Sequence, residues 1–198
     1  MFRNYFKIAW RNLIANKGFS AINIGGLSVG IAVAILIGLW IYSELSFNKN
    51  FENYDRIAQV WQHQEYNGIV GSQVANPAAM GPAIEDEFGG DFKYVIQSSW
   101  TNAHALTFGD KVFFKTGNYF EPEITEMLSL KMIYGNRDGL KEMHAVLLSK
   151  STAEVFFDDE DPVGKILKLN NQVDVKVTGV YEDLPENSSF NSLEIILP

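Results

Sequence analysis

The longest apolar run in the sequence covers residues 21–42 and contains no charged residue. As a helix, these 22 residues extend about 33 Å, enough to cross the roughly 30 Å hydrocarbon core of a bilayer. The run ends in Trp40-Ile41-Tyr42, and no small-x-small cleavage site follows it. A cleaved signal peptide, whose apolar core usually has about 7–15 residues, is therefore the weaker interpretation. The pattern predicts an uncleaved membrane helix over residues 20–43.

Small residues recur at every fourth position of this predicted span. They are Gly26, Gly30, Ala34 and Gly38. Because residues four apart share one helix face, the pattern favours close packing against another membrane helix. The alternative is compositional, since glycine and alanine are common in membrane helices. The partner helix would come from a second copy, from another subunit or from later sequence.

Residues 1–19 predict a separate amphipathic helix ahead of the span. Within 2–16, aromatic and aliphatic residues recur at helical spacing and cations lie between them. Such a helix suits the anionic headgroup layer of a membrane, although a simple basic flank of the anchor explains the composition equally well. The residues expected at the membrane interface are Arg3, Lys7, Trp10, Arg11, Lys17, Trp40 and Tyr42.

The distribution of charge predicts the orientation of the chain. Four cations and no acid precede the span, and the first acidic residue is Glu44. Since basic residues gather on the cytoplasmic side, we expect a cytoplasmic N-terminus and an exterior domain over residues 44–198. That domain holds all 24 acidic residues and 12 of the 16 basic ones. Its negative charge argues against nucleic acid as a partner, and the chain has no cysteine for disulfide or thiol chemistry.

Alternation and turn residues predict an α+β exterior domain, with mixed sheets and a few helices. Helices or helical turns are expected at 48–54, 78–88, 123–128 and 150–157, and strands at 57–62, 69–74, 94–101, 105–108, 112–115, 166–169 and 173–180. Asn67-Gly68 and Asn170-Asn171 are expected as hairpin turns. Ser149 is expected to cap the helix at 150–157.

The sequence offers little that indicates catalysis. Its three histidines, His63, His104 and His144, are far apart and lack neighbouring ligands at metal spacing. The acidic run 158–161 lacks the alternating ligands and the glycine of a calcium loop. Gly164-Lys165 lacks the glycine-rich lead of a nucleotide-binding loop. We therefore expect no metal, no cofactor and no catalytic site, and Asn187-Ser188-Ser189 is only a formal glycosylation sequon.

Two separated blocks carry a family resemblance. The first is KIAWRNLIANKGFSAINIGGL at residues 7–27, and the second comprises LSKSTAEVFF at 148–157, DPVGK at 161–165 and VTGVYEDLPENSS at 177–189. Together they resemble the FtsX/MacB-type permease subunits of bacterial ABC transporters. A weaker match lies at residues 119–124, and the pairs Ile124-Thr125 and Phe157-Asp158 depart from the usual family pattern.

The resemblance implies more than the composition shows. It implies a bacterial inner-membrane permease with a first membrane helix, a MacB-like periplasmic core domain over 44–198, and further membrane helices after residue 198. It also implies a dimer with a second copy or a homologous permease, a separate cytoplasmic ABC ATPase, and room for a periplasmic partner protein. ATP hydrolysis in that ATPase would move the periplasmic domain to extrude a periplasmic or membrane substrate.

Two other classes of protein share the same outline. A singly anchored sensor or interaction domain would also be acidic and non-catalytic. A periplasmic hydrolase would instead show turnover by its exterior domain. Three more apolar spans later in the gene would favour the permease, whereas a kinase or signalling domain would favour the sensor.

Overall fold

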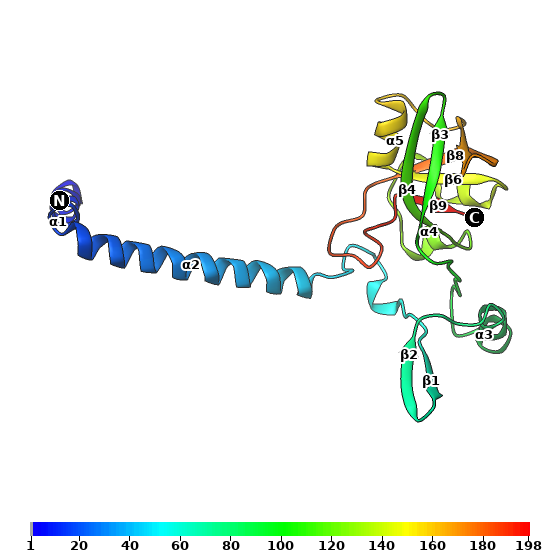
Figure 1. Cartoon of the computed structure of the whole chain (residues 1–198), viewed down its shortest axis with the longest axis horizontal. Coiled ribbons are helices and arrows are strands. Elements are labelled where there is room, and N and C mark those ends of the chain that lie inside the picture. The colour runs from blue at the N-terminus through cyan, green and yellow to red at the C-terminus, as the bar shows by residue number, and fades with distance from the viewer. Residues whose placement is uncertain (1) are drawn as a thin grey trace. The chain divides into compact units, whose positions relative to one another are not determined.

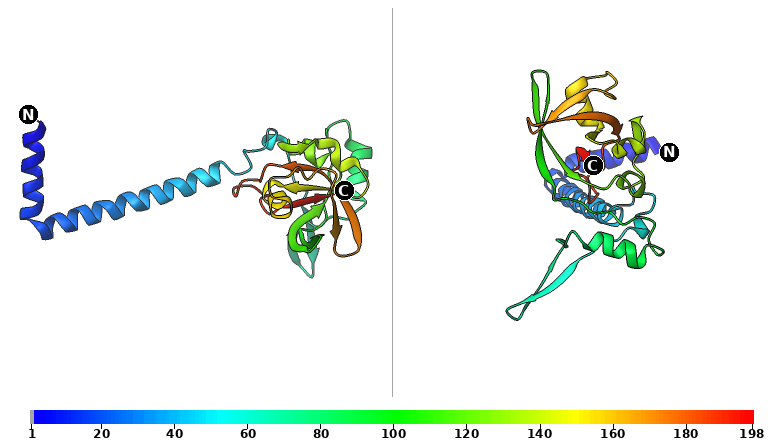
Figure 2. Two further views of the ribbon diagram at one scale, coloured as in Figure 1. Left: turned by 90° about the horizontal axis from the view of Figure 1, so that it is seen from above. Right: turned by 90° about the vertical axis from the view of Figure 1, so that its right-hand side faces the viewer.

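The computed structural model describes residues 2–198. They form two compact units, one that ends at Phe47 and one that covers Asn48–Pro198. The first unit consists of α1 (Phe2–Ala15) and α2 (Lys17–Leu45), which meet at a sharp angle (Figure 2). Asn16 separates them because its φ of −114° and ψ of 58° are not helical. Both helices were predicted, and α2 is the one helix among the described residues with the length and composition to cross a membrane.

The second unit contains two sheets and several short helices (Figure 1). Its strands are β1 (Gln62–Tyr66), β2 (Ile69–Gln73), β3 (Asn102–Phe108), β4 (Lys111–Tyr119), β5 (Met132–Gly135), β6 (Ala145–Ser149), β7 (Ile166–Leu169), β8 (Val173–Tyr181) and β9 (Ile195–Leu197). Its helices are α3 (Met80–Phe88), α4 (Ile124–Met127) and α5 (Lys150–Phe157), with 3-10 turns η1 (Tyr54–Arg56) and η2 (Arg137–Lys141). The predicted α+β class is confirmed.

The larger sheet closes on itself. Its seven strands follow the order β5-β8-β6-β9-β4-β3-β7, and β7 also pairs with β8. Six strands therefore form a ring of pairings, and β5 is attached to it through β8. The pairs β6–β8 and β4–β9 are parallel, whereas the remaining pairs are antiparallel. The other sheet is the hairpin β1–β2 alone.

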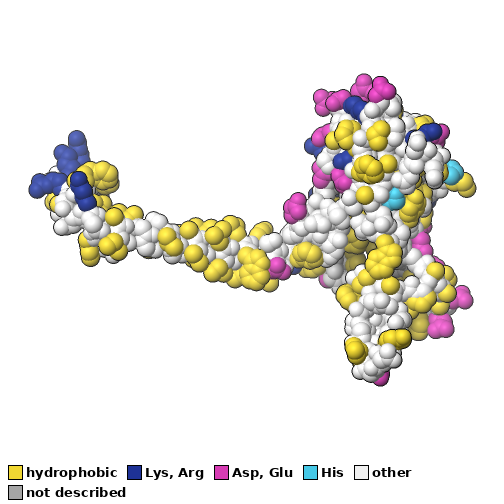
Figure 3. Space-filling view, viewed as in Figure 1, with side chains coloured by type: hydrophobic (Ala, Val, Ile, Leu, Met, Phe, Trp, Pro, Cys, Tyr) yellow, Lys and Arg dark blue, Asp and Glu magenta, His cyan; other side chains and the backbone are white. Residues whose placement is uncertain are grey.

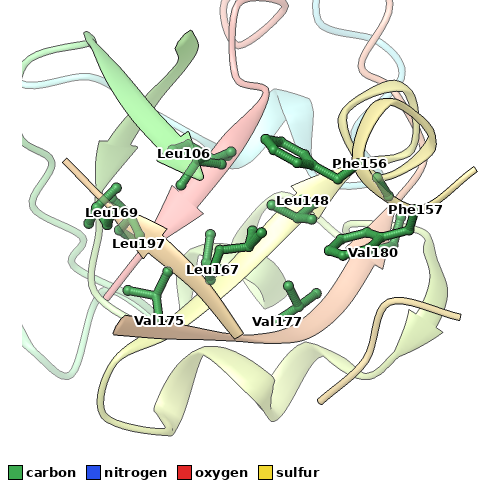
Figure 4. Close-up of a cluster of buried hydrophobic side chains, with 13 residues drawn as sticks. Leu106, Leu148, Phe156, Phe157, Leu167, Leu169, Val175, Val177, Val180 and Leu197 are labelled. Atoms are coloured by element: carbon green, nitrogen blue, oxygen red, sulfur yellow. The ribbon is translucent and has the colours of Figure 1, made fainter. Parts of the chain in front are cut away.

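Two hydrophobic clusters lie on opposite faces of the strands. The first, drawn in Figure 4, includes side chains from α5, and the second includes side chains from α4 and its neighbours. Strand β9 contributes to both, because successive side chains of a strand alternate between faces: Ile195 and Leu197 join the first cluster and Ile196 the second. An irregularity between β6 and β8 lets Val177 and Val180 both enter the first cluster.

Elements with a strong local signal form as predicted. Asn67-Gly68 has φ values of 53° and 79°, and Asn170-Asn171 has 49° and 57°, as tight hairpin turns require. The hydroxyl of Ser149 caps α5 by accepting a hydrogen bond from the amide of Thr152. The helix expected at 78–88 begins later, at Met80, and ends before Gly89 as predicted.

Three predicted elements are wrong. Of the strand expected at 57–62, only Gln62 belongs to β1, because the pairing with β2 ends at Gln62 and Gln73. Residues 94–101 form no strand and make only an isolated bridge between Ser98 and Phe120. The helix expected at 48–54 is a series of turns followed by η1. Strands β5, β6 and β9 were not predicted.

Candidate functional site

The first part of the candidate site is the cationic face of α1. Arg3, Lys7 and Arg11 are four residues apart and therefore share one side of the helix, where Figure 3 shows a dense group of cations. Phe6 and Trp10 are exposed, and with Lys7 and Arg11 they line a shallow depression. Cations beside exposed aromatic rings form a surface that suits anionic headgroups. The structure places four of the predicted interface residues on this helix.

The second part is α2, which has no buried residue. Its 29 residues extend about 43 Å. Lys17 is its first residue, and Trp40 and Tyr42 lie exposed in its last turns. The small residues all lie on this helix, and a Cβ added at Gly26, Gly30 or Gly38 would meet no atom within 4 Å. Their face is thus open to contact, and both its packing role and the interface role of the flanking residues stay predictions.

The third part is where the chain enters the second unit, at Asn48. The backbone amide of Asn48 donates to the carbonyl of Asn187 at 2.9 Å. Its side-chain Nδ2 donates to Ser189 Oγ at 2.9 Å, and its Oδ1 accepts from the amide of Ser189 at 2.8 Å. Asn48 has a φ of 61°, a left-handed conformation that asparagine tolerates better than most residues. One side chain therefore joins two segments that are 141 residues apart.

An apolar contact accompanies these hydrogen bonds. Phe51 is only 3% exposed, and its ring lies edge-on to Phe190 at 5.7 Å between centroids. Phe120, the residue after β4, lies on Phe190 as well, at 6.5 Å. We name Asn48, Phe51, Ser189 and Phe190 together the exit anchor. It was missed at the sequence level, because its two halves are distant in sequence and Asn187-Ser188-Ser189 suggested only a sequon.

The loop that carries Ser189 is itself well held. The buried hydroxyl of Ser188 accepts from the amide of Phe190 at 3.1 Å. The amide of Leu193 donates to the carbonyl of Phe190 at 3.0 Å, and the hydroxyl of Tyr181 donates to the carbonyl of Leu193 at 3.0 Å. Burial raises the pKa of Tyr181 well above its usual value, so this hydroxyl keeps its proton.

The three histidines are not brought together. His63 Nδ1 lies 2.7 Å from Ser72 Oγ within the small hairpin. His104 is buried edge-on to the ring of Tyr119, and His144 lies in a turn with a φ of 58°. Within residues 2–198, no group of three or more His, Asp or Glu side chains could hold a metal ion.

Comparison with known proteins gives a consistent result. The sequence profile of the MacB-like periplasmic core domain matches residues 20–198. A solved domain of a protein described as a permease from Porphyromonas gingivalis is 27% identical, with a TM-score of 0.50, and the match covers 60% of this chain and 55% of that one. No protein of curated function matches the chain significantly.

Two further solved structures show lower similarity. The periplasmic region of MacB from Actinobacillus actinomycetemcomitans is 19% identical, with a TM-score of 0.48 over 61% of this chain and 53% of that one. The extracellular domain of the ABC-type transporter YknZ from Gram-positive bacteria is 21% identical, with a TM-score of 0.48 over 61% of each chain. The matched region thus spans between 53% and 61% of the length of these solved chains.

Proposed function

Because this chain belongs to the family of MacB-like periplasmic core domains, we propose that it is the first membrane helix and exterior domain of an ABC-transporter-type permease. The observation that carries the proposal is the extent of the profile match, which begins at residue 20 and therefore includes most of α2 as well as the whole second unit. A domain profile that continues through an apolar helix supports a membrane-attached domain.

In this proposal α1 lies on the cytoplasmic surface of the bacterial inner membrane, α2 crosses it, and residues 44–198 are periplasmic. The cations of α1 would contact anionic lipid, and Trp40 and Tyr42 would lie at the outer interface. Reporter fusions after Lys17 and after Gln62 test this topology. We expect the first to be active only as a cytoplasmic reporter and the second only as a periplasmic one, and cytoplasmic activity after Gln62 would disprove it.

The proposed mechanism is mechanical. A separate cytoplasmic ABC ATPase hydrolyses ATP, and a second copy of the permease or a homologous permease completes the dimer. Movement of the membrane helices is passed to the periplasmic domain, which extrudes a periplasmic or membrane substrate, alone or with a periplasmic partner protein. The exterior domain itself performs no catalysis.

The decisive experiment is purification of the full-length protein in lipid nanodiscs. We expect an ABC ATPase to purify with it and to hydrolyse Mg-ATP in the complex. If no ATPase purifies with the protein and the gene continues into a kinase or another signalling domain, the permease proposal is wrong and the protein is a membrane-anchored sensor. Turnover of a test ester or peptide by the exterior domain would point to a hydrolase instead.

The small-residue face of α2 is the proposed contact with another membrane helix. Replacing Gly30 with Leu should reduce the amount of detergent-stable dimer that retains its ATPase, because the new side chain separates two closely packed backbones. Ile35→Leu conserves the side-chain volume on a different face of α2 and is the control. Unaltered assembly of the Gly30→Leu protein would show that the face is only compositional.

A further inference from the structure

We propose that the exit anchor is the element that passes movement of α2 into the sheet of the exterior domain. The inference deepens the proposed function and rests on it, since it assigns the step between helix movement and domain movement to particular residues. Asn48 and Phe51 would be the moving side of this contact, and Ser189 and Phe190 the side joined to the sheet.

Between Phe47 and Asn48, the backbone amides change from bonding within the end of α2 to bonding with the second unit. The amide of Phe47 donates back to the carbonyl of Glu44 at 3.3 Å, in the turn that ends α2. The amide of Asn48 donates to the carbonyl of Asn187 at 2.9 Å. A displacement at the end of α2 therefore reaches Asn48 through about 10 Å of chain or less.

The hydrogen bonds of Asn48 form the polar half of the exit anchor, and they depend on direction as well as distance. The side-chain amide of Asn48 uses its donor and its acceptor on the same residue, Ser189, and the backbone of Asn48 bonds to Asn187. Three hydrogen bonds from one residue restrain both translation and rotation at this point, because each weakens steeply when its angle changes. A single apolar contact would allow the two segments to slide.

The apolar half continues the contact into the sheet. Phe51 packs on Phe190. Phe51 belongs to the buried cluster that contains Leu193 and Ile196, and Phe190 packs against that cluster. The carbonyl of Phe190 accepts a hydrogen bond from the amide of Leu193, and Leu193 lies two residues before the start of β9. Strand β9 lies between β4 and β6 within the ring. The exit anchor is thus linked to an interior strand of the sheet.

The first measurement tests whether the contact holds the entering chain. Residues 1–198 contain no cysteine. Once any cysteine elsewhere in the full-length protein is replaced, doubly labelled copies with Glu52→Cys and Glu186→Cys, diluted with an excess of unlabelled copies, report one distance within the second unit. In the full-length protein in nanodiscs we expect a narrow distribution that broadens in Asn48→Gly. Glycine accepts the φ of 61° without strain, so this change removes the side-chain bonds without forcing a different backbone conformation. An unchanged distribution in Asn48→Gly would overturn the proposal.

The matched control is Asn171→Gly. It makes the same substitution at nearly the same backbone conformation, a φ of 57°, in the turn between β7 and β8. It should leave the label distance unchanged. Asn48→Asp should restore the narrow distribution, because the carboxylate can accept from the amide and from the hydroxyl of Ser189.

The second measurement tests transmission. A single label at Asp110→Cys, in the exposed turn between β3 and β4, reports the distance between two copies in the dimer with and without Mg-ATP and vanadate. We expect a shift in the parent that falls about threefold or more in Asn48→Gly, with hydrolysis retained and amide exchange in β6 unchanged. A full shift in Asn48→Gly would overturn the inference, whereas a parent without any shift would overturn the proposed function instead.

Discussion

Residues 52–101 and residues 102–198 belong to the same unit but are stabilised in different ways. In the first segment, all of which the structure describes, Gly81 is the only buried residue. The second supplies all but one of the buried apolar side chains of the two clusters. Ion pairs follow the same division, since every one among the described residues joins two residues between 111 and 194.

The first segment contributes only partly buried side chains such as Ile57 and Ile96 to a cluster, and it leaves nine large apolar side chains exposed. They are Tyr54, Val60, Trp61, Tyr66, Ile69, Val70, Phe88, Phe92 and Trp100. Its hairpin β1–β2 pairs with no other strand, and an isolated two-stranded hairpin is marginally stable in water. The difference teaches that the ring of strands has its own core, and we expect residues 52–101 to open at a much lower free-energy cost.

The largest expected effect comes from the core of the ring. Leu148 is fully buried in β6, and Leu148→Ala should lower the free energy of unfolding by about 2–5 kcal/mol. Ile69→Ala, at a residue that is 73% exposed in β2, should change it by about 0.5 kcal/mol or less. The hydrogen-exchange rates of the β6 amides, measured in the full chain of each variant, give the change in the free energy of unfolding. Equal effects of the two substitutions would remove the distinction between the segments.

A second pair of substitutions compares two strand glycines. A Cβ on Gly117 in β4 would lie 2.3 Å from the carbonyl oxygen of Ile195, whereas a Cβ on Gly71 in β2 would meet only the carbonyl oxygen of Gln64, at 4.0 Å. Gly117→Ala should therefore push β4 and β9 apart and cost about 1–3 kcal/mol or more. Gly71→Ala should be neutral or slightly stabilising, since it restricts the unfolded chain. Thermal unfolding of the two variants measures these changes. If Gly117→Ala leaves the unfolding temperature unchanged, the contact between β4 and β9 is loose.

The elements that the sequence predicted correctly are those whose signal is local. The hairpin turns at Asn67-Gly68 and Asn170-Asn171, the cap at Ser149 and the length of α2 are local signals, so they needed no knowledge of the rest of the fold. Strand β6 is buried at all five positions and therefore shows no alternation. Strand β9 has only three residues, too few for any periodicity.

The wrong predictions have a related cause. Residues 94–101 were predicted as a strand, yet their pairing with the end of β4 does not extend beyond an isolated bridge between Ser98 and Phe120. A strand forms only where a partner is present, and partners that are distant in sequence leave no local trace. The exit anchor was missed for the same reason, since Asn48 and Ser189 acquire their relation only through the fold.

A smaller effect is expected where the two segments meet. Gln97 donates from Nε2 to the carbonyl of Ala78 at 2.8 Å, and its amide donates to Glu121 Oε2 at 2.7 Å. Gln97→Ala removes the first bond, and the resulting loss of about 0.5–1.5 kcal/mol should be confined to the opening of α3. Hydrogen exchange should therefore accelerate in residues 80–88 and remain unchanged in β6. Acceleration in both would mean that the two segments unfold together.

The smallest effect concerns charge on the surface of residues 102–198. A hydrogen bond from Lys165, reinforced by its charge, lowers the pKa of Glu160 below its usual value. Since the folded-state pKa is the lower one, the pair stabilises the fold above the unfolded-state pKa of Glu160, and this contribution is lost as the pH falls through the folded-state value. Glu160 is fully exposed, so salt should weaken the pair and the effect on stability should be slight. An NMR titration of the Glu160 carboxyl measures the shift directly. Lys165→Gln should return its midpoint toward that of an isolated glutamate, and so should high salt in the parent. If neither Lys165→Gln nor high salt changes the titration midpoint of Glu160, the ion pair between Lys165 and Glu160 does not form in solution.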